Sequence, residues 1–575
     1  MGTRTSDNGR TTDAAAAAEA LGPEAGVLLR RLDPVGFLGA LGKAAAGLAR
    51  NPAGVIEASL GYVGGVAAAT AATGARVLGA DVAGPAEPAP KDRRFGDRTW
   101  QENPAYYLLL QHYLLFAKFM DDLVASARLD GRTALKAEFA VRQIVDALAP
   151  TNTLLNPAVL KRFLETGGAS VVRGARNLVD DVVGNGGFPR LVDRGAFVVG
   201  KDLAATPGQV VFRNDLMELI QYAPQTETVY EVPLLCSPPW INKYYVMDLA
   251  PNRSFVEWAV GHGHTVFAIS YRNPGEAMRE VKLDDYLVHG PRAALDAIEA
   301  ITGAPSTNIV GLCLGGSLTA MLLAYLEQLG ERRVRSATLL NTLLDFAEPG
   351  VLAAFTDEAT VAHLERQMAR RGYLQAGQMA STFTLLRAND LLWSSFVNNW
   401  LLGNDPPPFD ILAWNDDATR MPAAMHSFYL RSCYQRNDFA HGRLELAGEV
   451  LHPDSITGDV YILSAIEDHI APWHAGYAST RLLENASLRF VLSSSGHIAG
   501  IVNPPSPKSE YWTNDDLPQE PELWLEGATK RQGSWWEDWA VWIGERSGDR
   551  REPPPLGADG YEPLGDAPGT YIHEA

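Results

Sequence analysis

From about Glu231 onward, short apolar runs alternate with segments whose apolar residues recur at helical spacing. The apolar runs are residues 232–236, 265–269, 308–312, 334–340, 460–463 and 488–492. They end in polar or glycine-rich turns, and helix-like segments such as 291–302 and 317–329 lie between them. This alternation is typical of a mostly parallel sheet with helices on both faces, so we predict an α/β domain over residues 226–575.

One long stretch, at about residues 345–445, interrupts the alternation. It is rich in Trp, Asn and Pro and largely helical in pattern. An insertion of this size between two strands predicts a helical cap over the carboxyl edge of the sheet. Trp393, Trp400 and Trp414 are candidates to line a substrate channel under the cap, although packing within the cap explains each of them at least as well.

The chain before the α/β domain has a different pattern. Residues 1–90 are rich in Ala and Gly, which predicts a variable arm that adheres to a surface or a partner; a loosely ordered leader without a role is the alternative. Residues 91–225 are expected to form a mainly helical domain, because 106–123 and 135–148 carry apolar residues at helical spacing. Residues 58–75 lack charge, but Ala, Gly and Thr dominate them, so we predict no transmembrane span.

Charge and cysteine content exclude several classes of protein. The formal net charge is −19 and no Lys/Arg run is longer than a pair such as Arg332-Arg333, so we expect no binding of nucleic acid. The cysteines Cys236, Cys313 and Cys433 form neither an even set for disulfides nor a C-x-x-C zinc motif. The N-terminal residues lack the apolar segment of a secretory signal. We therefore predict a cytoplasmic protein without a bound metal.

The segment Gly311-Leu312-Cys313-Leu314-Gly315 joins an apolar run to a helix-like segment, which is the layout of a nucleophile elbow with Cys in place of Ser. The strained turn needs small neighbours, which Gly311 and Gly315 supply. Cys313 would project at a helix N-terminus, whose dipole stabilises a thiolate, and the N–H of Leu314 could face a developing oxyanion. A buried structural cysteine in a glycine-containing turn is the alternative.

A candidate acid and a candidate base follow two later apolar runs. Elbow enzymes of the α/β-hydrolase fold carry nucleophile, acid and His in that order along the chain. Asp468 comes after residues 460–463, and His497 after residues 488–492. We expect His497 to take the thiol proton and Asp468 to hold the imidazole, with Glu467 as the rival acid. His469 is assigned a supporting role.

A second oxyanion donor is expected from the loop after the first apolar run, Ser237 to Lys243. Its two consecutive prolines have no N–H to donate, so Trp240 and Ile241 are the first usable donors. The remaining histidines form no convincing ligand constellation, and we expect no cofactor.

Many short segments resemble those of polyhydroxyalkanoate synthases, from about Arg94 to the C-terminus. They are residues 94–100, 102–104, 150–152, 200–204, 238–243, 270–274, 387–391, 397–399, 468–470, 495–497, 533–536 and 567–571. The resemblance implies an α/β-hydrolase core with a helical cap insertion, preceded by a mainly helical N-terminal domain.

The same resemblance implies a reaction and its residues. Cys313, Asp468 and His497 would be the catalytic triad, with the N–H groups of Leu314 and Ile241 as oxyanion hole. The substrate would be (R)-3-hydroxyacyl-CoA and the product a polyester, with CoA as leaving group rather than cofactor. The chain looks like the single-subunit class I/II enzymes, and a homodimer at the surface of a polyester granule is expected, with granule-associated proteins as further partners.

Two other functions fit parts of the pattern. A Cys-dependent thioesterase or polyester depolymerase would use the same scaffold, and a non-catalytic protein could coat granules through the Ala-rich arm. A cysteine nucleophile and the extent of the resemblance favour the synthase. The preference for short or medium monomers stays open.

Overall fold

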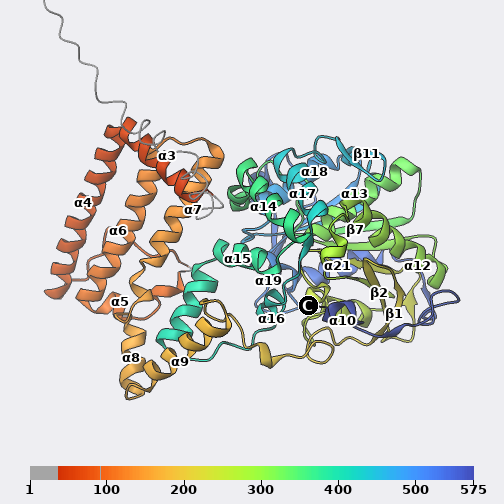
Figure 1. The fold of residues 1–575 in the computed structure, drawn as a ribbon, viewed down its shortest axis with the longest axis horizontal. Coiled ribbons are helices and arrows are strands. Elements are labelled where there is room, and N and C mark those ends of the chain that lie inside the picture. Colours follow the sequence, from red (N-terminus) through yellow and green to blue (C-terminus); the bar gives the residue numbers. More distant parts are fainter. Residues whose placement is uncertain (1–35, 91, 575) are drawn as a thin grey trace, which may run out of the picture.

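The computed structural model describes residues 36–90 and 92–574, which form a helical region beside a large sheet (Figure 1). The helical region holds α3 (Phe37–Arg50), α4 (Pro52–Val77), α5 (Thr99–Glu102), α6 (Pro104–Ser126), α7 (Gly131–Ala147), α8 (Pro157–Glu165) and α9 (Ala169–Gly184). Local capping explains where α4 and α6 begin. Asn51 and Asn103 each accept a backbone N–H in the first turn of the helix they precede, and each stands before a proline at the first helical position.

Part of the expected variable arm is helical and packed. Residues 1–35 of the arm lie outside the described residues, but α3 and α4 belong to the helical region. A methyl group added at Gly65 of α4 would meet Leu115 Cδ2 of α6 at 2.6 Å, and Tyr62 stacks on Phe119 at 5.0 Å between ring centroids. The small residues that suggested a loose arm instead allow α4 to lie closely against α6.

Within the described residues, α4 is the one helix long and apolar enough to cross a membrane by length and composition. Its mean hydropathy is 1.3 over an 18-residue window, of which 17% is buried. A helix that packs on a neighbour in a soluble protein passes the same test, so this is weak evidence for a span.

An 11-stranded sheet forms the rest of the molecule, in the order β15-β14-β13-β12-β7-β6-β4-β5-β2-β1-β17. Its strands are β1 (Gly208–Arg213), β2 (Met217–Tyr222), β4 (Leu234–Ser237), β5 (Val266–Tyr271), β6 (Thr307–Leu312), β7 (Val334–Leu340), β12 (Asp459–Ala465), β13 (Ser487–Ser493), β14 (Glu510–Thr513), β15 (Thr529–Gln532) and β17 (Gly565–Asp566). The six strands from β5 to β13 pair in parallel, and those outside them pair antiparallel. All six predicted apolar runs are strands of the parallel part.

The sheet begins earlier than the expected boundary at residue 226. β1 and β2 form an antiparallel hairpin that pairs with β5, so the end of the segment predicted to be mainly helical belongs to the sheet. β2 contains a fully buried glutamate, Glu218, which breaks the apolar pattern. The physical boundary between the helical region and the sheet therefore lies before Gly208.

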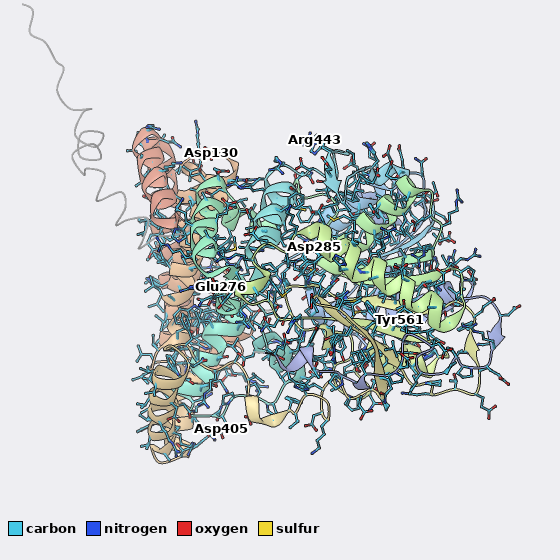
Figure 2. All side chains as sticks on the ribbon, turned by 45° about the vertical axis from the view of Figure 1, so that its right-hand side comes forward. Asp130, Glu276, Asp285, Asp405, Arg443 and Tyr561 are labelled. Atoms are coloured by element: carbon cyan, nitrogen blue, oxygen red, sulfur yellow. The ribbon has the colours of Figure 1, made fainter. Side chains whose placement is uncertain are left out.

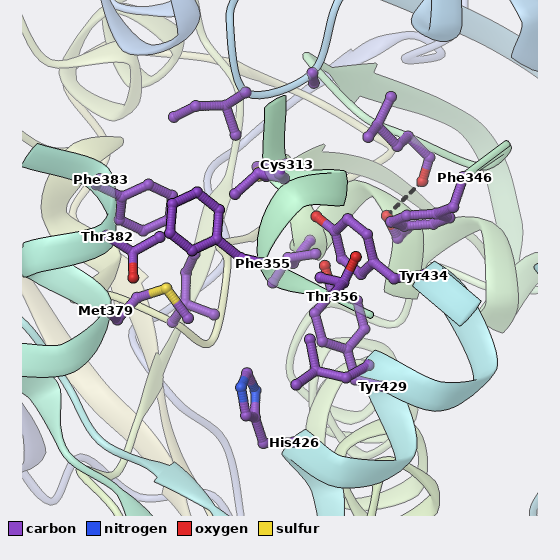
Figure 3. Close-up of a pocket in the computed structure, with 18 of the residues that line it drawn as sticks. Cys313, Phe346, Phe355, Thr356, Met379, Thr382, Phe383, His426, Tyr429 and Tyr434 are labelled. Carbon is purple, nitrogen blue, oxygen red and sulfur yellow. Dashed lines mark hydrogen bonds between the residues drawn. The ribbon is translucent and has the colours of Figure 1, made fainter. Parts of the chain in front are cut away.

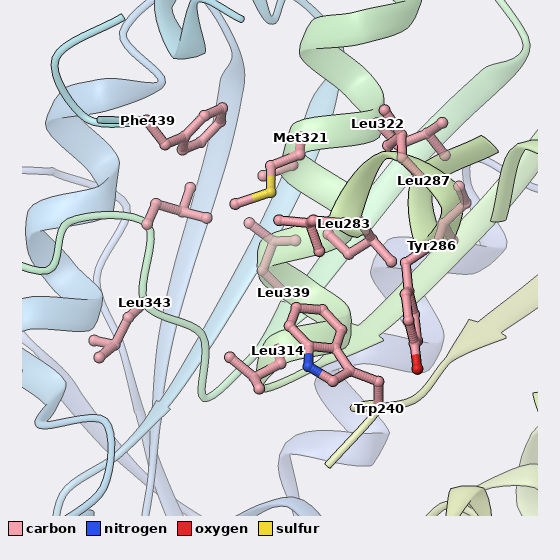
Figure 4. Packing of buried hydrophobic residues seen from close by; sticks show 14 of the residues in the cluster. Trp240, Leu283, Tyr286, Leu287, Leu314, Met321, Leu322, Leu339, Leu343 and Phe439 are labelled. Atoms are coloured by element: carbon pink, nitrogen blue, oxygen red, sulfur yellow. The ribbon is translucent and has the colours of Figure 1, made fainter. Parts of the chain in front are cut away.

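Helices cover both faces of the sheet. On one face, α11 (Leu283–Leu287) and α13 (Leu314–Leu329) pack against β7 through Leu283, Leu287, Met321 and Leu339 (Figure 4). On the other face, α21 (Trp535–Gly544) buries Trp535, Trp536 and Trp539. Because the central strands are buried on both faces, their sequences are continuous runs of apolar residues. Charged side chains such as Asp130, Glu276 and Asp405 lie at the surface (Figure 2).

The insertion between β7 and β12 forms the cap. Its main elements are η7 (Gly350–Phe355), α14 (Glu358–Arg371), α15 (Ala376–Leu386), η8 (Asn389–Trp393), η9 (Phe396–Leu401), α16 (Asp410–Asp416), α17 (Ala423–Tyr429) and η10 (Leu430–Gln435). The N-terminal helical region contacts this cap: Trp400 Nε1 donates to Asp181 at 2.7 Å, and Arg94 Nη1 donates to Asn389 at 3.0 Å. The cap thus lies between the helical region and the sheet (Figure 1).

Candidate active site

Cys313 lies at the tip of a sharp turn between β6 and α13. Its φ of 53° and ψ of −117° are unfavourable for a residue with a side chain. Three glycines make the turn possible: a methyl group would lie 2.6 Å from Gly316 Cα if added at Gly311, and 2.1 Å from the Ser237 carbonyl oxygen if added at Gly315. At Gly316 it would lie 1.9 Å from Thr342 Oγ1. This close packing accounts for the glycine spacing around the cysteine.

Asp468 and His497 are brought together by the ends of β12 and β13. His497 begins α19 (His497–Ile501), and its Nδ1 lies 2.6 Å from Asp468 Oδ2. The other carboxylate oxygen accepts the N–H groups of Ile470 and Ala471 at 2.8 and 2.9 Å. Both side chains are buried, whereas Glu467 is exposed. Both oxygens of the Asp468 carboxylate therefore have hydrogen-bond partners. The geometry favours Asp468 over Glu467 as the partner of the imidazole.

The Cys313 thiol is the other side-chain hydrogen-bond partner of His497. With Nδ1 directed to Asp468, Nε2 is the ring nitrogen left for the thiol. Burial lowers the pKa of His497, but the negative charges of Asp468 and Cys313 outweigh burial, so the pKa lies well above its ordinary value. The site thus favours a protonated imidazole between Asp468 and Cys313.

Two backbone N–H groups border the cysteine. Leu314 is the first residue of α13, so its N–H has no acceptor within the helix. Ile241 follows β4 and lines the same cavity as Cys313 and Leu314. Trp240 is instead buried between Tyr286 and Tyr429 and is not among the residues that line the cavity. Of the two candidate donors in this loop, Ile241 rather than Trp240 therefore lies in the wall of the cavity that contains the cysteine.

The loop that carries Ile241 is held from two sides, which the sequence did not reveal. The Lys243 ammonium donates to the carbonyls of Ile572 and Glu574 at 2.8 and 2.9 Å. The Lys243 carbonyl accepts the indole N–H of Trp414 at 2.7 Å, and the backbone of Asn242 bridges to Ala418. The C-terminal segment and the cap thus both fix the position of Ile241.

His469 lies near the site without lining its cavity. Burial lowers its pKa to about 4, although the nearby Asp468 carboxylate acts in the opposite direction. Its Nδ1 has no hydrogen-bond partner within the part of the chain that the structure describes. The ring is therefore neutral at pH 7, and its supporting role stays a prediction.

A cavity of about 120 Å³ extends from Cys313 under the cap. Cap residues supply most of its wall, and apolar side chains predominate (Figure 3). The apolar cap residues are Phe346, Leu352, Phe355, Leu364, Leu374, Met379, Phe383 and Leu430.

The three tryptophans considered for this wall are not among its residues. Trp393 packs against Phe396, and Trp400 reaches Asp181 in the helical region. Trp414 points to the loop that carries Ile241. An indole N–H needs a polar partner when it is buried, and for Trp400 and Trp414 that partner lies outside the cavity. Smaller aromatic and aliphatic residues line the cavity instead.

Metal chemistry finds no support in the described ranges 36–90 and 92–574. They hold no group of three or more His, Cys, Asp or Glu side chains arranged to bind a metal ion. Of the cysteines, Cys236 and Cys433 are buried and Cys313 is half-buried.

Comparisons with known proteins agree with this architecture. The family described as "Poly-beta-hydroxybutyrate polymerase (PhaC) N-terminus" matches residues 91–259, and the alpha/beta hydrolase fold matches residues 236–504. The chain is 42% identical over 529 residues to a poly(3-hydroxyalkanoate) polymerase of Methylorubrum extorquens, covering 91% of this chain and 87% of that protein.

Two further relatives are similar to the same degree. Poly(3-hydroxyalkanoate) polymerase 1 of Ectopseudomonas oleovorans is 42% identical, covering 85% of this chain and 87% of its own. The poly(3-hydroxyalkanoate) polymerase subunit PhaC of Cupriavidus necator is 42% identical, covering 84% of this chain and 83% of its own. The similarity thus includes both the helical region and the sheet.

Proposed function

This chain belongs to the poly(3-hydroxyalkanoate) polymerase family, and on that premise we propose that it joins (R)-3-hydroxyacyl groups from CoA thioesters into a polyester. The observation that carries the proposal is the contact of Cys313 with His497, and of His497 with Asp468, at one end of an apolar cavity. In the proposed mechanism these three residues are the catalytic triad.

The first half-reaction moves the acyl group to the enzyme. His497 takes the proton of the Cys313 thiol, and the thiolate attacks the carbonyl carbon of the acyl-CoA thioester. The N–H groups of Leu314 and Ile241 stabilise the oxyanion. The carbon–sulfur bond to CoA then breaks, and CoA leaves as a thiol with the proton from His497. One thioester replaces another, so this step is nearly neutral in free energy.

The second half-reaction extends the chain. A 3-hydroxyl group gives its proton to His497 as its oxygen attacks the acyl-Cys313 thioester. The new ester forms, and the thiol of Cys313 is restored by the proton from His497. An ester replaces a thioester in this step, which is downhill and drives growth. A serine nucleophile would carry an ester and would lose this driving force.

The apolar wall of the cavity supports transfer over hydrolysis. Water that reached the acyl-Cys313 thioester would release a free acid, and a largely apolar wall offers water few hydrogen-bonding partners. The hydrolase alternative therefore requires water at a site built to disfavour it.

Replacement of the nucleophile tests the proposal. We expect Cys313→Ala to abolish both CoA release from 3-hydroxybutyryl-CoA and polymer formation, because no other group can carry the acyl chain. Cys433→Ala is the matched control: this thiol is buried in the cap, burial raises its pKa to about 12, and it should keep activity near that of the wild type. CoA release is followed by thiol titration, and polymer is recovered and sized.

CoA release by the wild type without recovered polymer would establish the hydrolase instead. Polymer from Cys313→Ala in cells lacking any other polymerase would overturn the role of Cys313 and leave a non-catalytic function.

We also propose a cytoplasmic location at the surface of the polyester, and a homodimer. Synthesis of an insoluble product keeps the enzyme at that product's surface. Recovery of the protein with sedimented polymer, and its mass in solution by light scattering, check these two points.

A further inference from the structure

His426 is a polar residue in the wall of an otherwise apolar part of the cavity. It lies on α17, its side chain is 1% exposed, and it lines the same cavity as Cys313. Figure 3 shows its ring pointing from α17 into the space between Met379 and Tyr429, across the cavity from Cys313. It is therefore placed to meet a part of the bound chain remote from the reacting thioester.

Within the residues that the structure describes, one ring nitrogen of His426 has no hydrogen-bond partner. Nδ1 of His426 has no hydrogen-bond partner among residues 36–90 and 92–574, and its nearest aromatic neighbour is Tyr429, with ring centroids 6.2 Å apart. Burial lowers the pKa of His426 to about 4, so the ring is neutral at pH 7 and offers one donor and one acceptor. A buried polar group without a partner is unfavourable, and a ligand that supplies the partner removes this cost.

Other polar groups nearby are already engaged. The Thr382 hydroxyl donates to the Gln378 carbonyl at 3.0 Å, and the Gln378 amide donates to Gln367 at 2.6 Å. Tyr429 and Tyr434 hydrogen-bond to each other through their hydroxyls. Of these polar side chains, His426 is thus the one with a nitrogen that has no hydrogen-bond partner among the described residues.

A polyester of 3-hydroxy acids suits such a group. It carries a carbonyl and an ester oxygen in each repeat unit, which accept hydrogen bonds, but it has a donor only at its terminal hydroxyl. His426 lies across the cavity from Cys313, so a chain of more than one unit is needed to reach from the thioester to its ring. A donor across the cavity would therefore recognise the chain rather than the first acyl group.

We propose that the His426 ring donates a hydrogen bond to an ester oxygen of the chain bound at Cys313, at least one repeat unit away from the thioester. This inference rests on the proposed function, and makes His426 a residue that selects an elongated chain over a single unit. No bond is made or broken at His426.

The test compares substrates of different length on the same variants. The CoA thioesters of 3-hydroxybutyrate and of its linear dimer and trimer acylate Cys313, and kcat/KM is obtained from first-turnover CoA release. For the wild type we expect acylation by the dimer or trimer to exceed that by the monomer by about tenfold, equivalent to ~1.4 kcal/mol. In His426→Leu this gain should be lost, so that its kcat/KM with the dimer and trimer falls to its own value with the monomer.

Two further variants separate recognition from damage to the fold. His426→Gln keeps a donor and should recover part of the gain with length. Ser427→Ala is the matched control, because the Ser427 hydroxyl on the same helix points to Glu365 instead, and it should keep the full gain.

The outcomes are distinct. No CoA release by the wild type from any of the thioesters would refute the proposed function itself. Three other outcomes would each overturn the role of His426. They are an equal gain with length in wild type and His426→Leu, no gain in the wild type, and an equal loss of rate with all three substrates in His426→Leu.

Discussion

At the scale of single residues, the site depends on groups held by the backbone around them. The positive φ of Cys313 costs about 1–3 kcal/mol. The three glycines allow β6, α13 and the loop after β4 to pack closely, and this packing offsets the cost. The Asp468 carboxylate is fixed by two backbone N–H groups, so its position does not depend on the imidazole it contacts.

Asp468→Asn should reduce CoA release by at least ~100-fold, because an amide neither stabilises the imidazolium of His497 nor fixes its tautomer. Glu467→Gln, at the exposed neighbouring position, serves as control and should stay within about twofold of wild type. Initial rates of CoA release at saturating substrate give the comparison. Equal losses in both variants would show that the loop, rather than the carboxylate, is responsible.

The same pair predicts a pH dependence of stability. The folded state raises the pKa of His497, so the stabilisation is complete below the ordinary pKa of ~6.5 and is lost as pH rises through the raised value. The difference in thermal midpoint between wild type and Asp468→Asn should therefore be largest near pH 6 and shrink toward alkaline pH. A difference that grows with pH would contradict the assignment.

At the scale of elements, the parallel strands were predictable because burial on both faces makes each one a continuous apolar run. β14 and β15 lie at the edge of the sheet, and β15 (Thr529–Gln532) is exposed throughout, so no apolar run marks it. β2 carries the buried carboxylate of Glu218. Its hydrogen-bond donors are the N–H groups of Thr570 and Tyr571, which lie far along the chain. Local patterns cannot reveal such partners.

The candidate site was predictable to a similar extent. Cys313, Asp468 and His497 stand at strand ends, and strand ends are readable from the sequence. The wall of the cavity depends on how the cap folds back over the sheet. The sequence therefore could not decide whether Trp393, Trp400 and Trp414 line the cavity or pack elsewhere, and the structure places all three outside its wall. His426 lies in an apolar segment and has the pattern of an ordinary core histidine, and only its unsatisfied nitrogen in the cavity wall distinguishes it.

The loop after β4 offers a test at this scale. Lys243→Met should lower kcat about tenfold or more with little change in KM. It leaves the Ile572 carbonyl without its donor, removes one of the two donors to the Glu574 carbonyl, and so loosens the loop that carries Ile241. Lys530→Met removes a half-exposed ammonium that pairs with Glu510 on the sheet edge, and should change neither parameter. A rise in KM at constant kcat for Lys243→Met would argue against a role in positioning the oxyanion donor.

At the scale of the whole molecule, the helical region supports the wall of the cavity. Phe355 lines the cavity, and on its other side it packs against Phe139 of α7 and Phe37 of α3, with ring centroids 5.3 and 5.6 Å apart. The N-terminal helices therefore form an outer layer behind the acyl-binding space, and the structure gives them a part in its shape.

Phe139→Ala should accordingly raise KM for 3-hydroxybutyryl-CoA severalfold, because the cavity left behind Phe355 lets the wall shift. Phe119→Ala is the matched control: Phe119 belongs to another aromatic pair of the helical region, with Tyr62, away from Phe355. Its KM should equal that of the wild type. Kinetics of CoA release over a range of substrate concentrations decide the point, and the same KM in both variants would contradict it.

The contacts between the cap and the loop after β4 have a consequence for how the enzyme opens. Trp414, Ala418 and Asp417 of the cap bond to Lys243, Asn242 and Tyr245 respectively. If the cap lifted as one rigid body, it would pull the Ile241 N–H away from the thiol at the moment the cavity opened to water. The open enzyme would then lack one of its two oxyanion donors. Water could enter only while the thioester is less activated, and the acyl chain on Cys313 would therefore be protected from hydrolysis.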